Sequence, residues 1–197
     1  MFIQVITGEV ADAAALESAL DRWRSEVRPG GTGFLGSTSG VTADGRFVAL
    51  ARFESAEAAR ANSDRAEQGA WWSEAEKCFA GPVTFHDCTE VDTFRGGGSD
   101  EAGFVQVMQG RADRQRLRAL DERVEAVLPD LRPDLLGSVR ARGGDQYTEA
   151  AYFTSEAEAR AGEAKPPPAE LAEAMREWQD VMGPIAYYDL PRPKIVS

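Results

Sequence analysis

Hydrophobic and polar residues alternate at the start of the chain and then change to a helical period. Residues 2–7 alternate and are rich in β-branched side chains, which predicts a strand. Asp12 is of a type that caps helices. The apolar residues after it recur at the spacing of one helix face, at Leu16, Leu20, Trp23 and Val27. The pattern therefore predicts a strand followed by a helix, which ends at Pro29-Gly30-Gly31.

Two further strands are predicted at residues 34–41 and 46–53. The Asp44-Gly45 pair between them is typical of a hairpin turn. Ser55 then begins a second helical region, and a last strand follows Gly81-Pro82. The predicted order of elements is βαββαβ, the order of a ferredoxin-like unit.

The same pattern returns about 100 residues later along the chain. Three segments recur in order and at a nearly constant offset: residues 2–8 as 104–110, 34–37 as 135–138, and 53–55 as 153–155. In the second copy Asp113 stands where Asp12 caps the first helix. Three prolines at 166–168 interrupt its second helical region, because proline cannot continue a helix. We therefore expect two ferredoxin-like repeats, the second with its second helical region lost or rebuilt.

The repeats define the expected domains and their packing. We assign residues 1–95 to the first repeat, 96–102 to a linker and 103–197 to the second repeat. Each α+β repeat leaves one sheet face uncovered, and an apolar face must find a partner. We expect the repeats to pack sheet to sheet as a fused, pseudo-dimeric α/β barrel. Segments 91–94 and 194–196 are expected to add to the edge of the neighbouring sheet.

Composition limits the partners that the chain can have. The 197 residues include 33 acidic and 22 basic ones, a net charge of −11, which disfavours nucleic acid and an anionic membrane surface. No apolar run approaches the roughly 18–20 residues of a membrane helix, and the N-terminus is typical of a strand rather than a signal peptide. Cys78 and Cys88 do not make a disulfide framework. Without an export signal the expected compartment is the reducing cytoplasm, where both are expected to be free thiols. We expect a monomer with an internal pseudo-dimer, and further association is left open.

Two segments of the first repeat, with the start of its first strand, point to a family. Residues 33–37 and 46–58 resemble the antibiotic biosynthesis monooxygenase-like domain of the dimeric α/β-barrel superfamily. The resemblance implies a fused homodimer and one of the family's activities: oxygenation of phenolic or quinol substrates without a cofactor, haem degradation, or isomerase chemistry. The haem-degrading branch has a tryptophan and a ligand histidine on the second helix. Here that region has Trp71 and Trp72 but no histidine, so the haem ligand is not matched.

Candidate chemistry is limited by a single histidine and by the lack of a Cys-x-x-Cys motif, so no metal site is expected. We place a pocket in the first repeat, with His86 as proton acceptor and Arg52 as oxyanion donor. The residues expected to bind substrate are Gln4, Asn62, Trp71 and Trp72. Structural roles stay open beside these: a structural His86, a surface ion pair for Arg52 and a helix-end role for Asn62.

The leading functional hypothesis is a monooxygenase that acts on a small aromatic, quinol-like substrate without metal or flavin. Two alternatives stay open. One is a non-enzymatic barrel that holds a small apolar ligand, and the other is a structural protein whose barrel is filled. A structure with no cavity between the sheets would select the structural protein, and the most informative observation is whether a pocket opens beside His86 and the Trp71-Trp72 pair.

Overall fold

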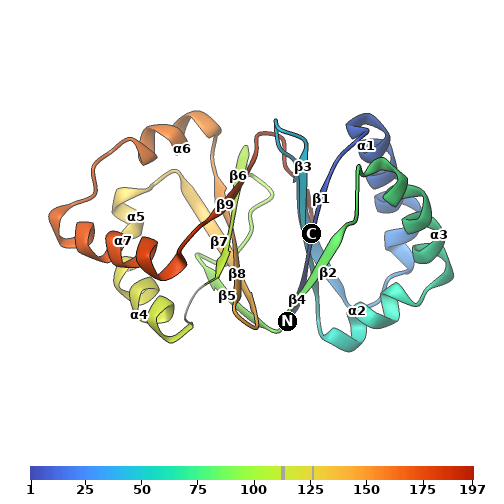
Figure 1. The fold of residues 1–197 in the computed structure, drawn as a ribbon, viewed down its shortest axis with the longest axis horizontal. Coiled ribbons are helices and arrows are strands. Elements are labelled where there is room, and N and C mark those ends of the chain that lie inside the picture. The colour runs from blue at the N-terminus through green and yellow to red at the C-terminus, as the bar shows by residue number, and fades with distance from the viewer. Residues whose placement is uncertain (112–113, 126) are drawn as a thin grey trace. The chain divides into compact units, whose positions relative to one another are not determined.

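The structure, a computed structural model, describes residues 1–111, 114–125 and 127–197 and divides into two compact units. Unit 1 comprises residues 1–90 and 194–197, and unit 2 comprises residues 91–193. Each unit has one five-stranded sheet with its helices on one face (Figure 1). Each unit therefore completes its sheet with a strand that lies beyond the limits of its own sequence repeat.

The sheet of unit 1 has the strand order β10-β2-β3-β1-β4, and every pair in it is antiparallel. Its strands are β1 (Phe2–Glu9), β2 (Phe34–Val41), β3 (Arg46–Phe53), β4 (Thr84–Cys88) and β10 (Lys194–Val196). The short β10 pairs with β2, so the C-terminal segment closes one edge of this sheet. The strands predicted at 2–7, 34–41 and 46–53 are confirmed, with β1 two residues longer than predicted.

Side-chain caps begin the first two helices of unit 1. Asp12 accepts a hydrogen bond from the Ala15 N–H at 2.9 Å and begins α1 (Ala13–Arg22). Ser55 accepts from the Ala58 N–H at 3.2 Å and begins α2 (Ala56–Ser63). The first helix continues through a π-helical turn and a short 3₁₀ turn, and α3 follows α2, with the bounds Trp23–Val27, Arg28–Gly30 and Ala66–Ala75.

Unit 2 repeats this arrangement with the strand order β5-β7-β8-β6-β9. Its strands are β5 (Glu90–Phe94), β6 (Phe104–Arg111), β7 (Leu135–Gly143), β8 (Gln146–Phe153) and β9 (Ala186–Leu190). Its helices are α4 (Arg114–Glu125), α5 (Leu128–Leu131), α6 (Glu156–Glu163) and α7 (Ala169–Met182). The prolines at 166–168 separate α6 from α7, so the predicted break is confirmed and the segment is rebuilt as a helix of 14 residues.

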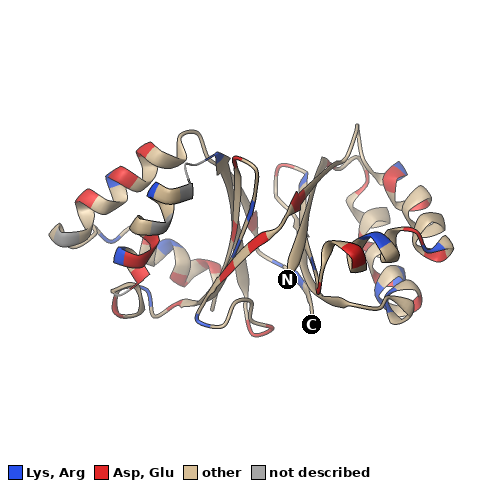
Figure 2. Cartoon of the chain, turned by 90° about the horizontal axis from the view of Figure 1, so that it is seen from below, with Lys and Arg blue, Asp and Glu red and all other residues tan. Residues whose placement is uncertain are grey.

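The α+β class and the two ferredoxin-like repeats are confirmed, and so is the pairing of segments 91–94 and 194–196 with β7 and β2. The cap predicted at Asp113 lies outside the described residues. The division at 1–95, 96–102 and 103–197 and the sheet-to-sheet packing stay predictions. Within each unit, acidic and basic residues are interspersed along the helices (Figure 2).

None of the helices described here has both the length and the apolar character needed to cross a membrane.

Candidate functional site

A cavity of about 310 Å³ lies between the sheet of unit 1 and the helices that cover it. Its floor is formed by the helix-facing side chains of β1, β2 and β3, and its roof by α1, the π-helical turn, α2 and α3. The C-terminal strand β10 also lines it, with Lys194 and Val196. This volume is at the lower end of the range for small-molecule sites in proteins. The cavity is therefore large enough for a compact organic ligand.

Small side chains on the sheet make room for the cavity. Ser37 lies directly opposite Ala51, and Ser39 directly opposite Ala49, where β2 pairs with β3. All four line the cavity. Residues directly opposite each other in adjacent strands share a sheet face, so these two pairs form one patch of small residues on the floor. Larger side chains at these positions would occupy the space that the cavity now has.

Aromatic rings form the wall above this floor. The ring centroid of Trp23 lies 5.2 Å from that of Phe34 and 6.1 Å from that of Trp71. Trp71 in turn lies 5.9 Å from Trp72, whose ring is 5.1 Å from Phe85. Three of the four tryptophans of the chain thus line one cavity. Flat apolar faces of this kind suit an aromatic ligand, which can stack on them or meet them edge to face.

Hydrogen bonds fix two of these indoles. The Trp71 Nε1–H donates to the backbone oxygen of Ala19 at 2.7 Å, which joins α3 to α1. The Trp23 Nε1–H donates to Gln68 Oε1 at 2.9 Å. Both indole donors are already engaged, so these tryptophans offer a ligand their ring surfaces. The cavity roof is held in one arrangement by these bonds.

Two predicted polar residues line the cavity, each with a partner in unit 1. The Gln4 Nε2–H donates to Asp87 Oδ1 at 3.0 Å. Asn62 is 9% exposed, and its Oδ1 accepts from Arg65 at 3.1 Å near the end of α2. Gln4 keeps its amide oxygen and Asn62 its amide N–H₂ group for other contacts. These two residues can serve a ligand while they also support the fold.

The charged residues that line the cavity are both cations, Arg24 and Lys194. The Lys194 Nζ lies 2.9 Å from Asp21 Oδ1 and 3.2 Å from Glu17 Oε1, both on α1. Partial burial by itself lowers the pKa of Lys194, but its bonds to these two carboxylates outweigh that effect and raise it. Among the described residues that line the cavity, none has a carboxylate or an imidazole. Arg24 also lies 3.5 Å from Asp21, so both cations are paired with carboxylates of α1. The lining therefore provides paired cations and amides rather than a side-chain base.

The structure does not bring Arg52 and His86 into this cavity. Arg52 lies opposite Ile3, and His86 lies opposite Val5. Side chains alternate along a strand, and Gln4, between Ile3 and Val5, faces the cavity. Arg52 and His86 therefore point to the other face of the sheet. The single pocket expected to combine them with Gln4, Asn62, Trp71 and Trp72 is corrected in this respect, and their catalytic roles stay predictions.

Both cysteines are buried in unit 1. Burial raises the pKa of Cys88 to about 11, with a smaller contribution from the Asp87 carboxylate. Because the thiolate is the reactive form, this thiol is a poor nucleophile at neutral pH. Within the described residues, no group of three or more His, Cys, Asp or Glu side chains is placed to hold a metal ion.

Unit 2 has large charged side chains at one of the two small floor pairs, while the other pair is again serine and alanine, Ser138 opposite Ala151. Its β7 and β8 pair in the same register, and Arg140 lies opposite Glu149 at the positions of Ser39 and Ala49. Arg140 Nε donates to Glu149 Oε1 at 3.0 Å, and the Tyr147 hydroxyl donates to Glu149 Oε2 at 2.6 Å. All three residues are buried. A hydrogen-bonded ion pair thus replaces the serine and alanine that open the cavity in unit 1.

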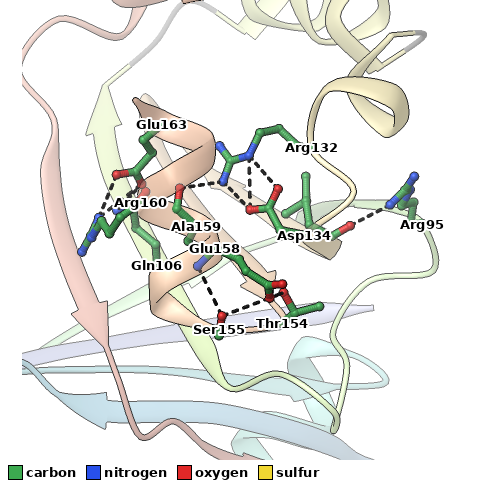
Figure 3. A network of polar contacts seen from close by, with 11 residues as sticks. Arg95, Gln106, Arg132, Asp134, Thr154, Ser155, Glu158, Ala159, Arg160 and Glu163 are labelled. Carbon is green, nitrogen blue, oxygen red and sulfur yellow. Dashed lines mark hydrogen bonds and ion pairs between the residues drawn. The ribbon is translucent and has the colours of Figure 1, made fainter. Parts of the chain in front are cut away.

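A second group of ion pairs lies around α6 in unit 2 (Figure 3). Glu163 corresponds in the repeat to the cavity-lining Ser63, and its carboxylate binds Arg160 at 3.0 Å. Gln106, the counterpart of Gln4, lies between Asp189 at 2.9 Å and Glu163 at 3.5 Å. The position of the cavity-lining Ser63 is therefore held by a charged side chain in unit 2, whereas Gln106 bonds to Asp189 as Gln4 bonds to Asp87.

Comparison with known proteins gives the fold a wider context. No family model matches the chain, and no curated protein matches its sequence. Among solved structures, a putative monooxygenase from Fusobacterium nucleatum is 9% identical with a TM-score of 0.76, covering 100% of this chain and 94% of that one. One from Lactobacillus acidophilus is 11% identical with a TM-score of 0.67, covering 96% of this chain and 92% of that one. An anthrone oxidase-like protein is 12% identical with a TM-score of 0.68, covering 98% and 93%. At these identities the comparisons show a shared fold.

Proposed function

Because the chain has the fold of monooxygenase-like proteins with two ferredoxin-like repeats in one chain, we propose that the unit 1 cavity binds a small aromatic, quinol-like substrate and promotes its oxygenation by O₂ without metal or flavin. The observation that carries the proposal is the cavity itself, with an aromatic wall over a floor of serine and alanine. The name of the anthrone oxidase-like neighbour is consistent with a substrate of this class.

The proposed reaction balances with O₂ as the only oxidant. The reacting ring carbon carries two hydrogens in the substrate and becomes a carbonyl carbon in the product. One atom of O₂ forms that carbonyl and the other leaves in water together with the two hydrogens. The carbon loses four electrons and O₂ gains four. The step that a protein can assist is formation of the substrate anion, because the anion passes an electron to O₂ more readily than the neutral molecule.

The chain would assist by stabilising that anion. The cavity offers the positive charges of Arg24 and Lys194 together with the amides of Gln4 and Asn62. Fixed donors and charges in a site with little water lower the energy of a developing anion more than they would in bulk water. The proton can leave to water at the cavity mouth, so the proposal needs no side-chain base. The tryptophan wall would hold the ring plane and limit the access of water.

Oxygen uptake tests this proposal. Wild-type protein is mixed with anthrone, whose central ring has a carbon with two hydrogens, under ¹⁸O₂, and O₂ consumption is compared with that of buffer alone. The expected result is uptake faster than in buffer, with one ¹⁸O atom in the newly formed carbonyl of the product. Ala49→Leu, which fills the floor, should lower the rate at least tenfold. Uptake equal to that of buffer, or equal rates in wild type and Ala49→Leu, would contradict the proposal.

The lack of a carboxylate or imidazole among the described lining residues favours a second candidate, a non-enzymatic binding protein for the same class of molecule. A protein that binds a ligand only when folded is stabilised by that ligand. This alternative predicts a higher melting temperature with anthrone under nitrogen, and no product above the buffer rate in air. The two candidates are thus separated by turnover, not by binding.

A further inference from the structure

Lys194 reaches the cavity from the far end of the chain. It lies in β10, directly opposite Ser39 of β2, and opposite residues share a sheet face. Ser39 lines the cavity, and so do Lys194 and Val196, which are two residues apart on β10. The segment that follows unit 2 therefore supplies one edge of the unit 1 cavity and one of its two cationic side chains.

The surroundings of the Lys194 ammonium group hold it at this edge and leave it able to bind a further group. Its two ion pairs, with Glu17 and Asp21, come from α1, so the side chain extends from the sheet toward the helix layer. An ammonium group has three N–H donors, and two carboxylates account for two of them. The side chain is 27% exposed, so the ammonium group is partly shielded from water at the edge of the cavity.

The strand that completes the sheet of unit 2, β5, carries a negative side chain, in contrast to Lys194 on β10. There β5 carries Asp92, whose carboxylate binds the buried Arg142. In unit 2 this strand thus contributes a negative group to protein ion pairs. In unit 1 the corresponding strand is β10, which contributes the positive group of Lys194 to an open cavity. The negative side chain on β5 thus belongs to a group of ion pairs around the buried Arg142, and the positive side chain on β10 borders a cavity.

We propose that Lys194 binds an anionic oxygen on the ring system of the ligand and makes the cavity selective for anionic over neutral aromatic molecules. This inference rests on the proposed function, because it assigns a residue to the ligand of the same cavity. It goes beyond that proposal by naming the group that the cavity recognises and the residue that recognises it. A charge-assisted hydrogen bond from an ammonium group is about twice as strong as a neutral one.

The test uses two probes of the same shape, 2-naphthoate and 2-naphthamide, and follows the quenching of tryptophan fluorescence by each. Wild type should bind the carboxylate about tenfold more tightly than the amide, as expected for one charge-assisted bond at a partly exposed site. Lys194→Met should lose that preference and keep its affinity for the amide within twofold. Lys194→Arg should retain the preference, because it keeps the charge.

Lys77→Met is the matched control, since Lys77 also pairs with a glutamate but is exposed and lies outside the cavity lining. It should behave as wild type. A merely structural role for Lys194 would weaken both probes equally, and circular dichroism checks that each variant is folded. Retention of the carboxylate preference in Lys194→Met, or no preference in wild type, would overturn the inference while leaving the cavity as the binding site. Binding of neither probe to wild type would overturn both.

Discussion

Ser39 lies directly opposite Ala49 on the cavity floor in unit 1. The same register in unit 2 places Arg140 opposite Glu149. Two copies of one supersecondary pattern thus differ at one cross-strand pair in both volume and charge. The pair with small side chains borders open space, and the pair with large side chains is buried and bonded. This contrast is the basis on which we propose the ligand site in unit 1.

Filling the floor should remove ligand binding without unfolding the chain. Ala49→Leu adds three carbon atoms at a position that faces open space, so the overpacking cost of roughly 1–3 kcal/mol seen in filled cores should be small here. We expect affinity for 2-naphthoate, measured by tryptophan quenching, to fall at least tenfold. Ala61→Leu makes the same change at an exposed position of α2 and should bind as wild type does. Equal affinity in the two variants would argue against the cavity as the site.

Because Trp71 donates a hydrogen bond to Ala19, replacing Trp71 should destabilise the protein more than replacing its neighbour Trp72. Trp71→Phe and Trp72→Phe remove the same atoms, but only the first removes a bond between α3 and α1. Within the described residues the Trp72 indole makes ring contacts and no hydrogen bond. Trp71→Phe should therefore lower the free energy of unfolding by about 1 kcal/mol more than Trp72→Phe. Urea titrations followed by circular dichroism measure this, and an equal loss would show that the bond adds nothing.

The contribution of the buried ion pairs of unit 2 to the free energy of unfolding should depend on Glu149. Glu149→Gln keeps the size of the side chain but removes the negative charge from beside Arg140. Arg140 keeps Asp121 and Glu125 as partners, so the loss is that of one hydrogen bond between charged groups, roughly 1.5–3 kcal/mol. We expect a loss of about that size in the free energy of unfolding. Glu173→Gln on the exposed face of α7 is the control and should change it by less than about 0.5 kcal/mol. A loss in Glu149→Gln no larger than in the control would contradict this account of the pair.

Asp121 should make its contribution to the free energy of unfolding fall as the pH rises, the opposite of the usual behaviour of a carboxyl group. Burial raises its pKa from 3.8 to about 6, helped by the Glu149 and Glu125 carboxylates, while Arg140 and Arg142 oppose the rise. Between these two values the folded state holds the proton more tightly than the unfolded state. Stability from this group is therefore fully present below about pH 4 and is lost as the pH rises through about 6.

Asp121→Asn removes this titration while keeping the side-chain size. The free energy of unfolding of wild type minus that of Asp121→Asn should fall as the pH rises from 4 to 7, as measured by urea titration at each pH. The same comparison with Asp130→Asn, an exposed residue of α5, provides the control. A difference that rises with pH would mean that the two arginines lower the pKa of this carboxyl instead.

Much of the fold could be predicted from the sequence because its determinants are local. The alternating pattern predicted β1, and the caps Asp12 and Ser55 predicted the starts of α1 and α2. The Asp44-Gly45 turn predicted the hairpin of β2 and β3. The copies also indicated that segments 91–94 and 194–196 complete the sheets. Each of these features depends on residues close together in the sequence or on comparison of the copies.

The site was harder to predict because it depends on which sheet face carries the open space. The sequence comparison favoured the face on which Arg52 and His86 lie, since that face of β3 differs between the copies. The cavity is on the other face, and its signal was the contrast of Ser39 and Ala49 with Arg140 and Glu149. Lys194 could not be assigned to it from periodicity, because the pairing of β10 with β2 joins residues far apart in the chain.

Isothermal titration of wild type with 2-naphthoate tests the central claim most directly, because it counts the sites. The open cavity of unit 1 and the bonded charges at the corresponding positions of unit 2 predict one ligand per chain, and no heat of binding in Ala49→Leu. Two ligands per chain, no binding to wild type, or one ligand still bound by Ala49→Leu would contradict the claim.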